Sequence, residues 1–316
     1  MNILITGATG FIGSRLVKRL AEEGSHQLYA IVRKTSKVDF LKKLGVNLIF
    51  ADLADYIPGL SSLCNPGMKI DAVFHCAAYV NDRDWDRLYK ANVIGTENIC
   101  GLALKLGVER MVYLSSVAVV SGNPQVPLTE ELPYSATNLY GLSKIEAEKK
   151  VLEYKELGLN TVILRPCMVY GEGEPHLMGL LLFFLKHRLL PIIGEGKNKM
   201  HLAYVGNVID AMILSLQKSR MLSGSYFVAD DEVLTVKEIL SILSRAVNGR
   251  EPAKMPYWAV SVLLKTPFIN KRLQFFQKDR VYDISRIKSE GFNARFHAED
   301  SLAKSAGFWL KPKNGL

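Results

Sequence analysis

The sequence predicts an α/β protein in which a doubly wound parallel sheet carries a smaller C-terminal lobe. Three observations lead to this prediction. Short apolar, β-branched runs alternate with longer segments of helical periodicity through the first half of the chain. A glycine-rich turn follows the first of these runs. The chain has 316 residues, which is more than a single hydrophobic core usually organises.

The first half contains six strand-like runs. The first two, Asn2–Thr6 and 27–33, flank a helical segment at Phe11–Glu23 and so predict a βαβ unit. The other four runs are 46–51, 72–76, 110–115 and 161–165. Because helical segments separate them, we expect parallel strands with helices on both faces of the sheet.

After residue 165 the alternation becomes irregular, and prolines at 166, 175 and 191 interrupt the chain. We therefore predict a dinucleotide-binding domain over 1–165. Residues 166–316 should form mainly a substrate-binding lobe, with segments that return to the first domain. Helices are expected at 177–186, 236–247 and 257–264, and a strand is expected at 225–229.

Composition limits the classes of partner. The net charge is +9, but the basic residues are scattered and are not interleaved with stacking aromatic residues, so we expect no nucleic-acid partner. The longest apolar run, 177–185, is far shorter than the roughly 20 residues that span a bilayer, so we expect no membrane partner. No Cys-x-x-Cys pair occurs, which favours the reducing cytoplasm and no metal site. The cysteines are Cys64, Cys76, Cys100 and Cys167.

The glycine-rich turn is typical of a Rossmann-type cofactor site. Its residues lie between the first strand and the first helix, where the chain backbone must come close to a pyrophosphate. Glycine removes the Cβ that would obstruct this approach, and the helix N-terminus offers unpaired N–H donors. The predicted cofactor-binding residues here are Gly7, Thr9, Gly10, Phe11, Ile12 and Gly13.

The end of the second strand indicates which cofactor is preferred. NAD-binding relatives of this fold place a carboxylate there, on the ribose hydroxyls, whereas this chain has Arg33 followed by Lys34. A guanidinium can pair with a 2′-phosphate, so we predict that NADP is preferred over NAD.

Tyr140 and Lys144 are four residues apart and so lie on one face of the predicted helix. A nearby ammonium favours the phenolate form of tyrosine, which would let Tyr140 exchange a proton with a hydroxyl or carbonyl oxygen. Ser115 and Ser116 end a strand upstream, where a hydroxyl can hold the reacting oxygen by a hydrogen bond.

With these motifs together, the chain resembles the extended short-chain dehydrogenase/reductase family, which includes nucleotide-sugar epimerases and dehydratases, dihydroflavonol reductases and 3β-hydroxysteroid dehydrogenases. The resemblance implies that Ser116, with Ser115 as the alternative, polarises the reacting oxygen. It implies that Tyr140 is the acid or base and that Lys144 also binds the nicotinamide ribose. It further implies a homodimer through helices at about 85–106 and 140–155. The other implied cofactor-binding residues are Asp52, Leu53, Ala77, Ala78, Asn92, Pro166 and Val169.

Two departures from the family pattern narrow the reaction. Dehydratases of the family usually carry an acidic pair after the catalytic hydroxyl residue, but this chain has Val117 and Ala118, which cannot transfer a proton. Epimerases often have an asparagine in the segment after the Arg-Pro strand end, where this chain has Cys167 and Met168. We therefore expect an NADP-linked oxidoreductase acting on a small-molecule secondary alcohol or ketone. A nucleotide-sugar epimerase without net redox change, and a cofactor-sensing protein without turnover, are the alternatives.

Overall fold

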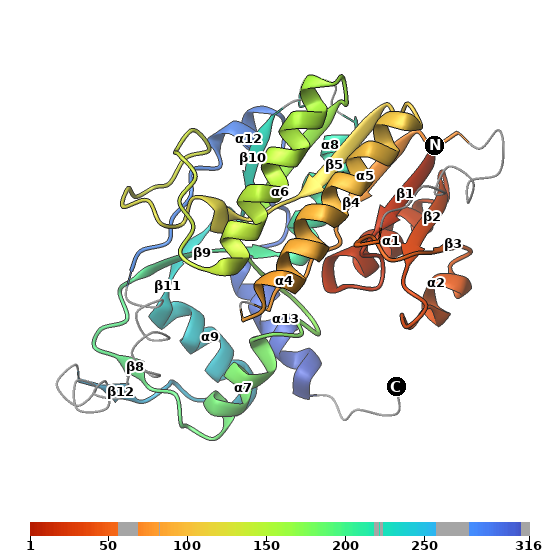
Figure 1. Ribbon diagram of the computed structural model, residues 1–316. Coiled ribbons are helices and arrows are strands. Elements are labelled where there is room, and N and C mark those ends of the chain that lie inside the picture. Colours follow the sequence, from red (N-terminus) through yellow and green to blue (C-terminus); the bar gives the residue numbers. More distant parts are fainter. Residues whose placement is uncertain (56–68, 82, 218–220, 222–223, 257–277, 311–316) are drawn as a thin grey trace.

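The computed structural model describes residues 1–55, 69–81, 83–217, 221, 224–256 and 278–310 (Figure 1). Its centre is a seven-stranded sheet with the order β10-β6-β5-β4-β1-β2-β3, and every neighbouring pair in it is parallel. The predicted fold class is therefore confirmed. The strands are β1 (Asn2–Thr6), β2 (Gln27–Val32), β3 (Asn47–Phe50), β4 (Ala72–His75), β5 (Arg110–Leu114), β6 (Thr161–Pro166) and β10 (Ser225–Val228).

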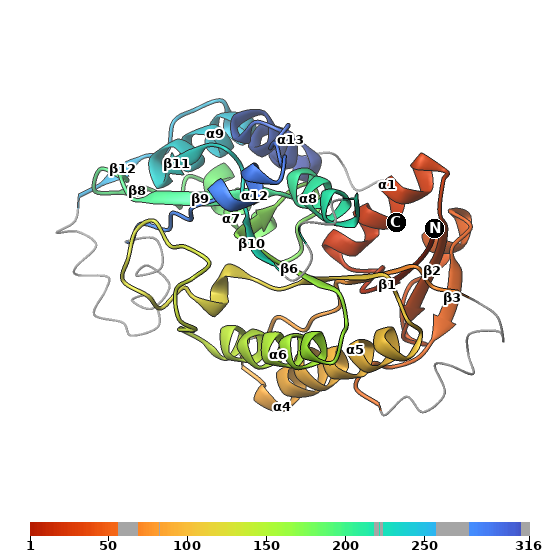
Figure 2. The same cartoon turned by 90° about the horizontal axis from the view of Figure 1, so that it is seen from above.

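Helices cover both faces of this sheet (Figure 2). One face carries α5 (Gly95–Lys105) and α6 (Leu139–Glu156), and the other carries α1 (Phe11–Glu23) and α8 (Val205–Gln217). Side chains of β1 therefore enter the two cores in turn: Ile3 and Ile5 belong to one buried cluster, and Leu4 belongs to the other. Both faces of the strands are thus core, which explains their continuous apolar runs.

The helix expected at about 85–106 is present as one unbroken helical segment, but it contains a π-helical stretch that was not predicted. The segment consists of α4 (Trp85–Leu88), the π-helical stretch η1 (Tyr89–Ile94) and α5. Asn92 lies in the π-helical stretch and is buried. Such wide turns occur often at functional sites, and propensity gives no signal for them.

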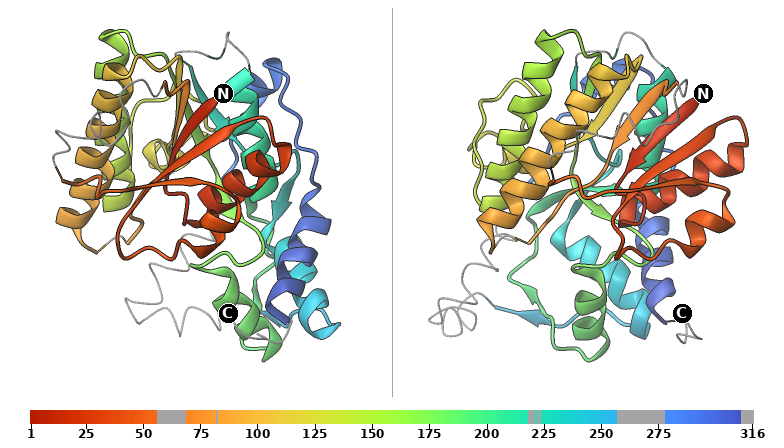
Figure 3. Two further views of the ribbon diagram at one scale, coloured as in Figure 1. Left: turned by 90° about the vertical axis from the view of Figure 1, so that its right-hand side faces the viewer. Right: turned by 45° about the vertical axis from the view of Figure 1, so that its right-hand side comes forward.

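The lobe lies beyond the carboxyl ends of the large-sheet strands (Figure 3). Its three-stranded sheet has the order β11-β9-β7, made of β7 (Met168–Tyr170), β9 (Lys199–Tyr204) and β11 (Val233–Thr235). A two-stranded sheet pairs β8 (Ile192–Ile193) with β12 (Lys254–Met255). The lobe helices α7 (Met178–Lys186), α9 (Val236–Asn248) and α13 (Ala298–Leu310) pack on one another. The helix expected at 257–264 and Cys64 lie outside the described residues.

Asp230 joins the lobe sheet to the end of β10. Its carboxylate accepts hydrogen bonds from the Tyr204 backbone N–H at 2.7 Å, Asn207 Nδ2 at 2.8 Å and the Tyr170 hydroxyl at 2.9 Å. The residue is completely buried, and burial raises the pKa of its carboxyl to about 6. Three donors therefore depend on one buried acceptor.

Replacing this acceptor should destabilise the fold. We expect Asp230→Ala to lower the free energy of unfolding by about 3 kcal/mol, since each buried donor left without a partner costs roughly 1–3 kcal/mol. The neighbouring Asp231 makes only a surface ion pair with Lys288, so Asp231→Ala should change stability by less than about 1 kcal/mol. Denaturant unfolding of both variants measures the difference; equal losses would contradict the role given to Asp230.

Candidate active site

The parallel sheet brings the predicted site residues to one edge. Gly7 follows β1, Arg33 follows β2, Ala77 lies just beyond β4, Ser116 just beyond β5, and Pro166 ends β6. The order of the strands reverses between β1 and β4, and ligands of open α/β sheets bind outside the carboxyl ends at such a point. The fold thus brings residues that are far apart in the sequence to the same edge of the sheet.

The glycine turn is closely packed, as the sequence analysis expected. Gly7 has a φ of +68°, and a Cβ there would lie 2.6 Å from the Ala77 nitrogen. A Cβ on Gly13 would lie 2.2 Å from the Gly7 carbonyl oxygen. No side chain caps the N-terminus of α1, and no acidic residue occurs in its first turn. The turn therefore presents its backbone N–H groups without a competing carboxylate, as an anionic ligand requires.

The outer cofactor residues lie where the two edge strands end. Arg33 and Lys34 are exposed directly after β2. Asp52 is exposed after β3, and its Oδ1 accepts a hydrogen bond from the Ala54 N–H at 3.0 Å. The Leu53 carbonyl accepts from Asn98 Nδ2 at 2.8 Å, which attaches this loop to α5. This hydrogen bond from α5 thus fixes the position of the loop that follows β3.

Tyr140 and Ser116 come together because α6 begins close to the short 3₁₀ turn η2 (Val117–Val119). The Asn138 side chain caps α6 by accepting from the Gly141 N–H at 2.8 Å. A Cβ on Gly141 would lie 2.9 Å from the Ala118 carbonyl oxygen, so glycine permits the close approach. A hydrogen bond links Ser116 to Tyr140.

Lys144 is buried one helical turn after Tyr140. Its Nζ donates to the Leu114 carbonyl oxygen at 2.8 Å and to the Tyr113 hydroxyl at 3.2 Å, and it lies 4.7 Å from the centre of the Tyr113 ring. Burial lowers the pKa of this ammonium to about 8, against the opposing effect of Glu148. The sequence analysis did not single out Tyr113.

The pKa of Tyr140 differs from the expectation. We expected Lys144 to lower it, but burial raises it to about 12, and the Ser116 hydrogen bond offsets only part of this rise. Burial of the phenol is the larger effect, and the Lys144 ammonium donates its hydrogen bonds to Tyr113 and Leu114. Tyr140 in the protein alone is therefore a neutral phenol at physiological pH, which is the form that donates a proton.

A series of buried hydrogen bonds links β1, β4 and the helix segment 85–105 next to this site. His75 contacts Thr6 Oγ1 through Nδ1 at 2.6 Å and Thr96 Oγ1 through Nε2 at 2.9 Å. Thr96 Oγ1 donates to the Asn92 carbonyl at 2.5 Å. Burial, with a smaller contribution from Lys144, lowers the pKa of His75 to about 3, so its ring is neutral. Thr6, His75 and Thr96 are far apart in the sequence, so no sequence periodicity predicts this arrangement.

Asn92 connects this series of hydrogen bonds to α6. Its Oδ1 accepts from the Tyr79 N–H at 2.7 Å, while its Nδ2 donates to the Tyr79 carbonyl at 2.9 Å and to Ser143 Oγ at 2.8 Å. Ser143 Oγ in turn donates to the Tyr140 carbonyl at 2.8 Å. Asn92 therefore holds the backbone beyond β4 against the start of α6, a role that fits its place near the catalytic helix.

The remaining predicted residues lie between the large sheet and the lobe sheet. Pro166 ends β6 opposite Val228 of β10, and Val169 pairs with Ala203 in the lobe sheet. The Ser115 side chain is buried, and its Oγ makes no hydrogen bond within the described residues, in contrast to Ser116. Ser116 is thus the hydroxyl that geometry joins to Tyr140.

Comparison with known proteins identifies the family. The sequence model described as "NAD dependent epimerase/dehydratase family" matches residues 3–229. The chain belongs to this family. A 2-alkyl-3-oxoalkanoate reductase from Stenotrophomonas maltophilia is 30% identical over 315 residues, covering 95% of this chain and 88% of the reductase. A putative dihydroflavonol 4-reductase from Synechocystis is 31% identical, covering 80% of this chain and 75% of that protein.

The fold is shared with solved enzymes of the family. The UDP-glucuronic acid 4-epimerase of Bacillus cereus, solved in complex with NAD, superposes with a TM-score of 0.78 over 98% of both chains at 20% identity. The predicted family and the prediction that the protein is an enzyme are confirmed. Among the described residues, no helix is long and apolar enough to cross a membrane, and no three potential metal ligands cluster.

The packing of the turn predicts the effect of one methyl group. We expect Gly13→Ala to abolish measurable binding of nicotinamide dinucleotides and to lower the melting temperature, because its Cβ cannot fit against the Gly7 carbonyl. A Cβ on Gly307 of α13 would meet no heavy atom within 4 Å, so Gly307→Ala is the matched control. It should leave cofactor binding unchanged and should not lower the melting temperature, because alanine is the better helix former. Cofactor fluorescence and thermal melting measure this; normal binding by Gly13→Ala would contradict the packing argument.

Proposed function

We propose that the protein is an NADP-linked reductase that converts a ketone into a secondary alcohol, with Tyr140 as the proton donor. The observation that carries this proposal is the meeting of Ser116, Tyr140 and the buried Lys144 at the carboxyl edge of the sheet. A phenol whose pKa is about 12 keeps its proton at neutral pH and is ready to give it to a carbonyl oxygen.

The residues divide the reaction as follows. The Ser116 hydroxyl donates a hydrogen bond to the carbonyl oxygen and holds it beside Tyr140. Tyr140 then transfers its proton to that oxygen as negative charge develops there. The Lys144 ammonium stabilises the resulting phenolate through the electrostatic field of the site, in which Tyr113 fixes its position. When bound, the nicotinamide supplies the hydride, or accepts it in the reverse direction.

The turn and the strand ends fit a dinucleotide. Gly7 and Gly13 allow the tight backbone packing of the turn, and the uncapped start of α1 offers N–H donors. The residues proposed to hold the pyrophosphate are Gly7, Thr9, Gly10, Phe11, Ile12 and Gly13. Arg33 is proposed to pair with the 2′-phosphate of NADP. Asp52, Leu53, Ala77, Ala78, Asn92, Pro166 and Val169 are proposed to line the rest of the cofactor site.

The substrate is proposed to be only weakly charged. Val117 and Ala118 carry no acid that a dehydratase reaction needs, and Cys167 lies in the segment where family epimerases often have an asparagine. The two relatives of 30% identity or more described above are both reductases by name. α7 and the residue before it expose Leu177, Leu180 and Phe184, which suits an apolar ligand. An epimerase remains the alternative, and tightly retained nicotinamide without net redox turnover would favour it.

Assembly and location are also proposed from the family resemblance. The outer surface of η1 and α6 exposes Tyr89, Leu142 and Leu152, which gives the predicted homodimer contact an apolar component. A cytoplasmic location remains a prediction from the cysteine pattern. In the described part of the chain Cys76, Cys100 and Cys167 are free thiols.

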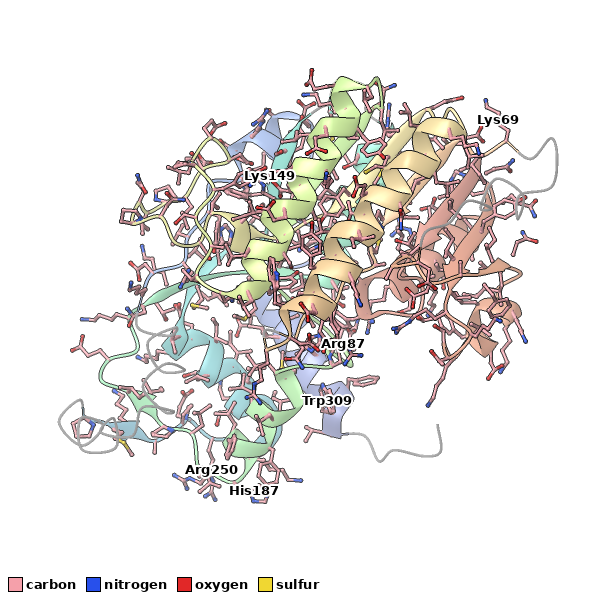
Figure 4. All side chains as sticks on the ribbon, viewed as in Figure 1. Lys69, Arg87, Lys149, His187, Arg250 and Trp309 are labelled. Carbon is pink, nitrogen blue, oxygen red and sulfur yellow. The ribbon has the colours of Figure 1, made fainter. Side chains whose placement is uncertain are left out.

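The catalytic assignment predicts two different defects. We expect Tyr140→Phe to lower turnover of a ketone substrate by at least about 10²-fold, because it removes only the donated proton, and to leave NADPH affinity nearly unchanged. We expect Lys144→Ala to lower turnover and also to weaken NADPH binding. Steady-state kinetics and fluorescence titration measure these effects. Tyr29→Phe on β2 and Lys149→Ala on the exposed side of α6 are controls outside the proposed site (Lys149 is labelled in Figure 4). Near-normal turnover by folded Tyr140→Phe would exclude the mechanism.

The cofactor assignment depends on one exposed guanidinium. We expect Arg33→Ser to weaken NADPH binding by roughly 10- to 100-fold, the range for loss of a hydrogen bond to a charged group, while NADH binding changes little. Lys149→Ser removes the same charge from the far side of α6 and should leave the ratio of affinities unaltered. Equal wild-type affinities for the two cofactors would rule out the NADP preference.

A further inference from the structure

Glu148 is a buried carboxylate that lies one helical turn beyond Lys144 on α6. Arg165 of β6 binds it through two hydrogen bonds, Nε to Oε1 at 3.0 Å and Nη2 to Oε2 at 2.7 Å. The Tyr134 hydroxyl donates to the same Oε2 at 2.8 Å. Only 6% of the Arg165 side chain and none of the Glu148 side chain is exposed, so this ion pair is shielded from solvent.

We propose that Glu148 is a positioning residue for the reaction, whose fixed negative charge keeps the buried Lys144 in its ammonium form. This inference rests on the proposed function, since Lys144 must stay charged to stabilise the Tyr140 phenolate. α6 places the two buried side chains at i and i+4, on one helix face, where neighbouring Cβ atoms are about 5–6 Å apart. The carboxylate acts on Lys144 through this proximity, because its hydrogen bonds go to Arg165 and Tyr134.

The other titratable groups around Lys144 do not supply this charge. His75 on β4 is neutral, because burial lowers its pKa to about 3. Burial raises the pKa of Cys76 and that of Tyr140 to about 12, and it raises that of Tyr113 well above its usual value, so all three are uncharged at neutral pH. Glu148 and Cys76 raise the pKa of Lys144 against the larger effect of burial. Glu148 is therefore the anionic partner among the described residues that act on Lys144.

A purely structural role makes a different prediction. Arg165 also donates to the Glu130 carbonyl, and the Glu130 side chain accepts from the Phe227 N–H of β10, so the ion pair helps to join α6, β6 and β10. If Glu148 only joined these elements, its loss would lower stability and leave the pKa of Lys144 in place. The two roles are separated by measuring that pKa directly.

The test is an NMR titration of protein labelled with [ε-¹³C]lysine, in which Lys144→Met identifies the Lys144 signal. We expect a midpoint near 8 in the wild type, and a midpoint lower by roughly one pH unit in Glu148→Gln. In a ketone-reduction assay, the fall of kcat/KM with rising pH should move to lower pH by the same amount, because the ammonium is lost earlier.

Matched variants complete the experiment. Glu146→Gln removes an equal charge from the solvent side of the same helix, where Glu146 pairs with Lys149, and should leave the midpoint unchanged. Glu148→Gln combined with Arg165→Met leaves no unpaired buried charge, so it serves if the single variant does not fold. Because the double variant also removes a cation, its midpoint is compared with that of Arg165→Met and should be lower. A midpoint equal to that of its reference, the wild type for the single variant and Arg165→Met for the double variant, would overturn the proposal. A lowered midpoint in a protein that reduces no ketone would instead reject the proposed function.

Discussion

The pairing of β1 with both β2 and β4 determines which edge of the sheet carries the candidate site. From β1 the strand order runs to β2 and β3 on one side and to β4, β5, β6 and β10 on the other. In open parallel sheets, a crevice forms outside the carboxyl end of the strand at which the order reverses. Gly7 can occupy that crevice only without a side chain, since the backbone of residues 76 and 77 lies directly against it. The helix that follows is thereby aimed at the same edge to which α6 brings Tyr140.

Behind this edge the site is unusually polar for a protein core. The neutral His75, Asn92 and Ser143 are all buried, and each is hydrogen-bonded to a neighbour that belongs to a different element. Buried polar groups are costly unless they are paired, so such a network has few alternative arrangements. The consequence is that the start of α6 is held by directional bonds as well as by apolar packing, which keeps Tyr140 in one place.

Much of the fold could be predicted from the sequence because its signals are local. The apolar runs indicated the strands of the first half, the glycine turn indicated the start of α1, and Tyr140 and Lys144 lie on one helix, as their spacing requires. The π-helical stretch at Asn92 could not be predicted, since it depends on the contacts of that side chain with residues 79 and 143. Glu148 was also missed, because its partner Arg165 is 17 residues away on another element and only the fold joins them.

The edge strand β10 has a consequence for biosynthesis. It pairs with β6 through residues Ser225–Val228, about sixty residues after β6 itself ends. While the ribosome is making the intervening lobe segment, β6 presents an apolar strand edge with unpaired backbone groups, a surface that invites pairing with other chains. The first 166 residues therefore cannot complete the large sheet by themselves, and its last strand pair forms only after the chain has returned from the lobe.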